Sequence, residues 1–179
     1  MSYVRFAVAL GLGLLILPVA VGAQVGFDPG VKVGELAPKF QLPDQNGVLQ
    51  DFDSLKGDNG LAILFFRSAD WCPFCKTALA QLEQERSGYE RQGVKVVGIS
   101  YDSLDILKTF ERRVGIAYPM LSDKGSKIIS AYGILNTDVP ADNAQYGIPH
   151  PGMFILDSNG RIISKYFEEN FRERFTPAT

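Results

Sequence analysis

The sequence contains very few of the residues that bind metals or cross-link a small fold. Its 179 residues include only two cysteines, Cys72 and Cys75, and one histidine, His150. A structural zinc site usually has four nitrogen or sulfur ligands, so this set is too small for one. A purely structural disulfide remains an alternative, but closing so short a loop removes little entropy from the unfolded chain. The pair is therefore expected to carry reversible redox chemistry, and the sequence implies no metal and no organic cofactor.

The sequence also lacks an excess of either charge. It has 18 Lys and Arg against 20 Asp and Glu, without a basic stripe or a run of like charges. Domains that bind nucleic acid usually carry such a basic surface, so no nucleic-acid partner is expected. With 46% hydrophobic residues, the chain is long enough for one domain with a full core.

Residues 1–23 differ from the rest of the chain. Arg5 is their only charge, Phe6–Val21 is almost wholly apolar, and Val21-Gly22-Ala23 resembles a cleavage site. This pattern predicts a secretory signal peptide and leaves 24–179 as a single domain. The alternative is an uncleaved membrane anchor, because the apolar run approaches spanning length. Export would place the protein in the periplasm or another extracytoplasmic, oxidising compartment, with no other membrane contact expected.

The two cysteines lie between a predicted strand and a predicted helix. The apolar run Leu61–Phe66 precedes them, and a helical pattern runs from about Pro73 to Gln92. A Cys-x-x-Cys pair in this position is typical of a redox-active dithiol. The unpaired N–H groups at a helix N-terminus stabilise a thiolate, so Cys72 is the predicted nucleophile at the exposed helix end. Cys75, one turn in and more buried, would resolve the mixed disulfide.

The remaining sequence predicts strands that alternate with helices. Asn46-Gly47 is a strong hairpin turn between two short apolar segments. A buried strand is expected at 94–100, followed by a helix that Asp102-Ser103 would cap. The apolar face of this helix would contain Leu104, Leu107, Phe110 and Val114. The remaining expected elements are a short helix near 124–132, a loop at 136–150 beside the active site, and a terminal hairpin within 153–166. Such an alternation indicates an α/β sandwich.

Several motifs in the chain resemble one known family. The segment Trp71-Cys72-Pro73-Phe74-Cys75-Lys76 resembles the W-C-x-x-C-K active site of the thioredoxin superfamily. The segments Gly34–Asp44 and Phe154–Gly160 resemble the AhpC/TSA branch, the peroxiredoxin-like redoxins, and the similarity extends from Val33 to Lys165. The resemblance implies a thioredoxin-like three-layer α/β/α sandwich with a mixed central sheet and an N-terminal β-hairpin extension.

The same resemblance suggests residues that support the dithiol. Pro151 occupies the place of the superfamily's cis-proline, and His150 before it would then face the cysteines. An imidazolium there would favour a thiolate, although an ordinary loop histidine is the alternative. Trp71 would shield one side of the site and offer a flat surface to a partner. Pro73 and Phe74, between the cysteines, would tune dithiol stability, and Lys76 completes the motif.

The substrate is the main open question. An ungapped comparison with the peroxiredoxin pattern P-x-x-x-T-x-x-C places Ser68 at the Pro, Cys72 at the Thr and Cys75 at the peroxidatic Cys. The Thr hydroxyl that holds peroxide is thus missing. The family also has an Arg that activates the peroxidatic Cys, and no motif in this chain identifies it; Arg67 and Arg161 are candidates without a matching motif.

The sequence therefore favours thiol–disulfide exchange with protein or small-molecule thiols and disulfides, coupled to an external thiol reductant or oxidant. One alternative is a thiol-dependent peroxidase that reduces peroxides with Cys75 or Cys72 as the peroxidatic residue. A second alternative is a non-catalytic exported binding domain that retains the fold.

Overall fold

The computed structural model describes residues 27–167 of the chain. The predicted signal segment 1–23, with the domain boundary that follows it, lies outside the described residues. The elements, in chain order, are β1 (Gln41–Pro43), β2 (Leu49–Asp51), α1 (Phe52–Leu55), β3 (Gly60–Phe65), α2 (Pro73–Arg91), β4 (Val94–Ser100), α3 (Leu104–Val114), β5 (Met120–Ser122), α4 (Lys127–Ala131), β6 (Gly152–Asp157) and β7 (Ile162–Phe167).

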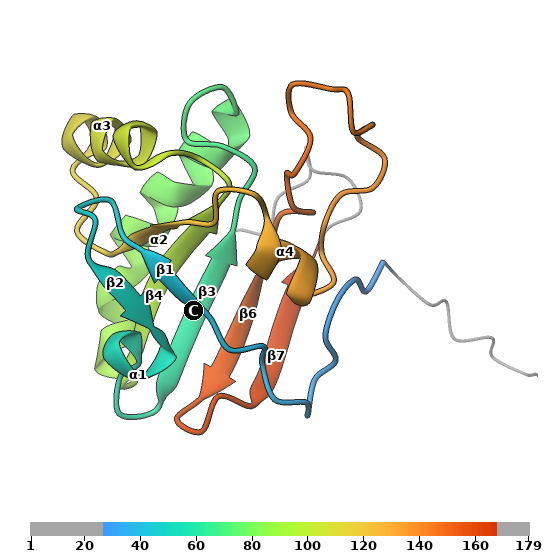
Figure 1. Ribbon diagram of the computed structural model, residues 1–179. Helices are drawn as coiled ribbons and strands as arrows, with labels where there is room; N and C mark the ends of the chain where they lie inside the picture. Colours follow the sequence, from blue (N-terminus) through green and yellow to red (C-terminus); the bar gives the residue numbers. More distant parts are fainter. Residues whose placement is uncertain (1–26, 168–179) are drawn as a thin grey trace, which may run out of the picture.

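A five-stranded sheet with the order β5-β4-β3-β6-β7 forms the centre of the molecule (Figure 1). β3 pairs in parallel with β4, and β4 with β5, whereas β6 runs antiparallel to β3 and β7 antiparallel to β6. All six residues of β3 are buried, as expected for a central strand covered on both faces. The predicted mixed sheet is confirmed.

Each face of the sheet has its own apolar core. On one face, Leu79 and Leu82 of α2 pack with Leu107 and Phe110 of α3. The other face is covered by the β1–β2 hairpin, α1 and α4 (Figure 1). The hairpin forms around Asn46-Gly47 as predicted, with Leu42 paired to Gln50. The structure therefore has three layers, together with the N-terminal β-hairpin extension that the sequence predicted.

Two local predictions differ from the structure. The strand β5 was not predicted, because three residues after Pro119 are too few to show a period, and only the pairing of Met120 with Gly98 defines it. At the start of α3, Ser103 occupies the N-cap position but its side chain makes no capping hydrogen bond. The Asp102 carboxylate also turns away from this helix, toward the loop before the cysteines.

The strand register determines which residues lie near the dithiol. Phe65, at the end of β3 that leads toward the cysteines, pairs with Gly152, so 150–151 lie at that end of the sheet. At the other end, Gly60 pairs with Asp157. Arg161 follows Asp157 in the β6–β7 turn and donates a hydrogen bond to the Gly34 carbonyl. The sequence-based nomination of Arg161 as an activating residue is therefore wrong.

Candidate active site

Helix α2 begins directly after Cys72, and this residue caps the helix. Cys72 has an extended backbone, and its Sγ accepts the backbone N–H of Cys75 at 3.3 Å. Pro73 occupies the first helical position, where its missing N–H costs no hydrogen bond. The Cys72 sulfur thus lies where an N-cap acceptor would be, and the helix N-terminus favours negative charge there. This is the placement that the sequence predicted for Cys72.

Both cysteine side chains are buried. Cys72 is 1% exposed and Cys75 is 0% exposed, so the predicted exposure of Cys72 is wrong. The reason is tertiary: the two sulfurs belong to the apolar core that also contains Ala69, Leu79 and Met153. Burial in apolar surroundings disfavours a thiolate, and this effect opposes the stabilisation of the thiolate by the helix N-terminus. Reaction with a partner therefore requires the covering side chains to move.

The Trp71 indole is fixed by polar contacts and by a cation. Its Nε1–H donates to the Tyr101 hydroxyl at 3.0 Å, and the Arg67 guanidinium lies 4.9 Å from the ring centroid. Burial raises the pKa of Tyr101, so this hydroxyl stays protonated in neutral solution. Trp71 is half-buried, whereas Phe74 is exposed to 40% of its surface. The aromatic covering of the dithiol is therefore partly accessible to a partner.

Asp102 connects the end of β4 to the loop that carries the cysteines. Its Oδ2 accepts the Ala69 N–H at 2.7 Å and the Ser100 hydroxyl at 3.0 Å, and Ser68 is also a hydrogen-bond partner. The carboxyl is only 4% exposed, and this burial raises its pKa despite the hydrogen bonds, of which that from Ala69 has the largest effect. Sequence reasoning assigned Asp102 to a helix cap. The useful signal was its position just past a buried parallel strand, next to the end of β3.

Ser68 holds the next part of the same loop. Its hydroxyl oxygen accepts the N–H of Asp70 at 2.9 Å and that of Trp71 at 3.4 Å. Lys76 donates its backbone N–H to the Cys72 carbonyl at 3.1 Å, which is the first turn of α2. Side-chain oxygens of Asp102 and Ser68 that accept backbone N–H groups therefore position the loop between β3 and α2.

The segment around Pro151 differs from the expectation. No cis peptide bond occurs within residues 27–167, so the predicted cis form of Pro151 is wrong. Backbone pairing holds the segment: the His150 N–H donates to the Ile134 carbonyl at 2.7 Å, and Pro149 bridges to Leu135. These contacts fix an extended strand-like path into β6.

The His150 imidazole packs edge-on against the Phe27 ring, with 5.0 Å between centroids. Burial lowers the pKa of His150, and the opposing attraction of Asp138 is smaller. The imidazole is therefore largely neutral near pH 7. An electrostatic effect on the dithiol would need the protonated form, which requires more acidic conditions.

Residues 27–167 contain no cluster of three or more His, Cys, Asp or Glu side chains that could hold a metal ion. Within the same range, none of the helices has both the length and the apolar character needed to span a bilayer.

A dithiol at the N-terminus of α2, on a mixed sheet with a hairpin extension, defines a thioredoxin-like protein. Residues 33–165 match the model of the AhpC/TSA family, and the chain belongs to this family. The matched range is the one over which the sequence motifs resemble it.

Relatives of known name include two kinds of enzyme. The chain is 29% identical over 167 residues to the thiol-disulfide oxidoreductase ResA of Bacillus anthracis, covering 90% of this chain and 87% of that protein. It is 30% identical over 146 residues to the chloroplastic peroxiredoxin Q of Gentiana triflora, covering 81% of this chain and 63% of that protein. Both kinds act on sulfur groups, and the chain is accordingly an oxidoreductase of this class.

Solved structures show the same fold. The crystal structure of peroxidoxin BcpB from Mycobacterium tuberculosis superposes with a TM-score of 0.69 at 21% identity, over 78% of this chain and 87% of that one. A peroxiredoxin-like protein from Aquifex aeolicus gives a TM-score of 0.68 at 24% identity, over 82% and 81% of the two chains.

Proposed function

We propose that the protein catalyses thiol–disulfide exchange, with Cys72 as the nucleophile and Cys75 as the resolving residue. The observation that carries this proposal is the hydrogen bond from the Cys75 N–H to the Cys72 sulfur at the N-cap of α2. It places the Cys72 sulfur against a backbone N–H at the positive end of the helix, where a thiolate is favoured. The similarity to a thiol-disulfide oxidoreductase over 90% of the chain also supports it.

The reaction proceeds in two exchanges. The Cys72 thiolate attacks one sulfur of a partner disulfide, the partner S–S bond breaks, and the departing sulfur takes a proton from solvent. Cys75 then loses its proton, attacks the Cys72 sulfur and closes the Cys72–Cys75 disulfide, which releases the second partner thiol. The partner gains two electrons and the dithiol loses two. An external thiol reductant restores the dithiol by the same chemistry, and the reverse direction oxidises a partner.

The surrounding residues would support these steps. Trp71 and Phe74 offer a partly exposed aromatic surface for the partner. Pro73 fixes the first turn of α2, and Lys76 closes it. His150 and Pro151, at the end of the sheet nearest the dithiol, would offer backbone groups to an extended partner segment.

The test is trapping of the mixed disulfide. Cys75→Ser leaves the nucleophile without its resolving thiol, so partners are expected to accumulate as covalent complexes on non-reducing gels. Cys72→Ser should trap none, and the double variant gives the background. If Cys72→Ser alone traps partners, the assignment of the two roles is reversed and the proposal fails.

Peroxide reduction is the second candidate, favoured by the 30% identity to a peroxiredoxin Q. In the ungapped comparison Cys75 takes the peroxidatic position and Cys72 replaces the Thr that would orient peroxide. A peroxidase would form a sulfenic acid on Cys75 in the Cys72→Ser variant after hydrogen peroxide treatment. Turnover of insulin disulfides without peroxide consumption would favour exchange, and absence of both activities would favour a non-catalytic binding domain.

We also propose that the protein is exported to an extracytoplasmic compartment. The apolar segment 6–21 and the small residues up to Ala23 support this. A compartment without strong thiol reductants would let the Cys72–Cys75 disulfide persist between cycles.

A further inference from the structure

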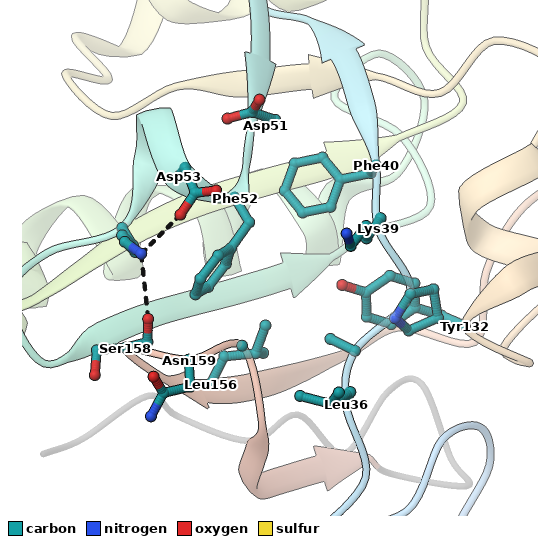
Figure 2. Close-up of a pocket in the computed structure, with 14 residues that line it drawn as sticks. Leu36, Lys39, Phe40, Asp51, Phe52, Asp53, Tyr132, Leu156, Ser158 and Asn159 are labelled. Carbon is teal, nitrogen blue, oxygen red and sulfur yellow. Dashed lines mark hydrogen bonds and ion pairs between the residues drawn. The ribbon is translucent and has the colours of Figure 1, made fainter.

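A cavity of about 480 Å³ lies on the face of the sheet that carries the hairpin, α1 and α4 (Figure 2). Its walls come from the segment before β1, from α1 and from the β6–β7 turn. That turn lies beside Gly60 at the start of β3, whereas the dithiol follows the other end of the same strand. The cavity is therefore separate from the active site.

Apolar side chains form about half of the cavity lining. Figure 2 shows Phe40, Phe52, Leu36 and Leu156 around the cavity, and Pro38 also belongs to its lining. Cavities of this size with aromatic walls and a few polar groups are typical of sites for small molecules. The two phenyl rings suit a flat apolar ligand.

One polar group in the cavity wall lacks a partner. Tyr132 is 0% exposed, and no hydrogen bond to its hydroxyl is found within the part of the chain that the structure describes. Its ring is held against Phe65 at 4.9 Å and Phe154 at 5.3 Å between centroids. Burial raises the pKa of Tyr132, so the hydroxyl remains a proton donor. Figure 2 shows this hydroxyl directed toward the cavity, on the side of Lys39.

Charged groups surround the cavity. The Lys56 ammonium donates to Asp53 at 2.7 Å and to the Ser158 carbonyl at 3.3 Å. The Asp51 carboxylate accepts the Ser54 N–H and caps α1. Both carboxylates are thus engaged, and the exposed Lys39 adds a second cation to the lining. The two carboxylates and two ammonium groups of the lining balance in charge, and Lys56 pairs with Asp53, so an anionic group on the ligand would face Lys39.

We propose that this cavity binds a small aromatic carboxylate. The ring lies between Phe40 and Phe52, and the carboxylate accepts a hydrogen bond from Tyr132 and faces the Lys39 ammonium. Because the hydroxyl is covered by its neighbours, pairing with the ligand requires a small displacement of wall side chains. Pairing would satisfy a buried donor that otherwise destabilises the folded state.

The test uses 1-naphthoate as the probe and amide chemical shifts in NMR spectra as the readout. The wild-type protein should bind it saturably, with shifts at Phe40 and Phe52. Tyr132→Phe should weaken binding about tenfold, since it removes a hydrogen bond to a charged group. Lys39→Gln should weaken it about threefold in low salt and less in high salt. The neutral analogue 1-naphthalenemethanol should bind more weakly than 1-naphthoate.

Matched variants separate binding from folding. Tyr118→Phe removes another buried hydroxyl, which donates to the Leu79 carbonyl at 2.9 Å away from the cavity. It should lower stability yet leave naphthoate affinity unchanged, whereas Tyr132→Phe should not lower stability. Lys108→Gln, an exposed change on α3, should affect neither.

Three results would overturn the proposal. They are non-saturating binding, shifts centred on the Trp71 loop, and equal affinity of Tyr132→Phe and wild type. Equal affinity for 1-naphthoate and the neutral analogue would show that the cavity does not recognise a carboxylate. Disulfide exchange by Tyr132→Phe should match wild type, so a failure of the exchange proposal would not affect this test.

Discussion

At the scale of single residues, two opposing influences act on the Cys72 sulfur. The helix N-terminus and the Cys75 N–H favour its thiolate, while burial in the core disfavours charge. Near pH 7 the uncharged His150 adds little to this balance, because its own burial lowers its pKa. We therefore expect the reactivity of Cys72 to depend mainly on backbone donors and solvent access.

The contribution of His150 is testable through the pH dependence of thiol alkylation. A protonated imidazole would favour the Cys72 thiolate, but the lowered pKa of His150 confines that form to pH below about 6.5. We expect His150→Ala to slow alkylation of Cys72 several-fold in this acidic range and to match wild type above pH 7. Identical rates at every pH would show that His150 does not act on the sulfurs, and His150→Gln serves as the size-matched control.

Asp102 should make stability depend on pH in the direction opposite to that of a carboxylate whose pKa is lowered by folding. Burial raises its folded-state pKa above the ordinary value of 3.8, so the folded protein binds the proton more tightly than the unfolded chain. The stability of wild type relative to Asp102→Asn should therefore be highest below pH 3.8 and fall as pH rises through the raised pKa. Each tenfold difference in proton affinity between the folded and unfolded chains contributes about 1.4 kcal/mol to this fall.

Urea unfolding of both proteins at a series of pH values measures this difference. Asp105→Asn, an exposed change on α3, controls for the loss of one negative charge. A stability of wild type relative to Asp102→Asn that rises with pH would contradict the expected sign. Faster alkylation of Cys72 in Asp102→Asn would further indicate that the carboxylate positions the loop through Ala69.

At the scale of elements, β3 supports both the active site and the cavity. Its C-terminal end leads to the Cys72 loop, and its first residue, Gly60, lies against the turn that lines the cavity. Gly60 has φ +141°, and a Cβ there would overlap the Leu156 carbonyl. The start of β3 therefore tolerates no side chain, because a shift of this strand would break its pairing with β6.

Two glycine substitutions test this constraint. Gly60→Ala should lower the free energy of unfolding by about 3 kcal/mol or more, since it combines backbone strain with overlap. Gly115→Ala is the matched control, because its φ is +80° but its Cβ would meet nothing within 4 Å. It should cost only about 1–2 kcal/mol for the left-handed conformation. Equal costs in urea unfolding would show that the contact with Leu156 does not constrain β3.

At the scale of the whole molecule, the predicted leader would determine the compartment in which the dithiol works. The described residues begin after it, and the proposal of export depends on 1–23 alone. Mass spectrometry of the protein from its native host should find a mature N-terminus at Gln24. Ala23→Arg should block cleavage and leave a longer chain. An intact 1–23 on wild-type protein in the membrane fraction would show an anchor instead.

The sequence by itself determined the features that depend on near neighbours in the chain. The apolar run at Leu61–Phe66 specified a central strand, Asn46-Gly47 specified the hairpin, and Cys72-Pro73 specified the start of α2. Each follows from local backbone preferences and from side-chain periodicity. These features predicted an α/β sandwich and the location of the dithiol, and the resemblance of the motifs to the AhpC/TSA branch added the thioredoxin-like fold.

Only the tertiary structure decided features that join distant segments. The burial of Cys72 depends on Met153 from β6, and the hydrogen bond of Asp102 to Ala69 spans two strand ends. The trans bond before Pro151 accompanies pairing with Ile134, and the Tyr132 cavity requires the hairpin and the β6–β7 turn together. Side-chain packing and long-range hydrogen bonds decide these contacts, and no local pattern in the sequence specifies which distant groups will meet.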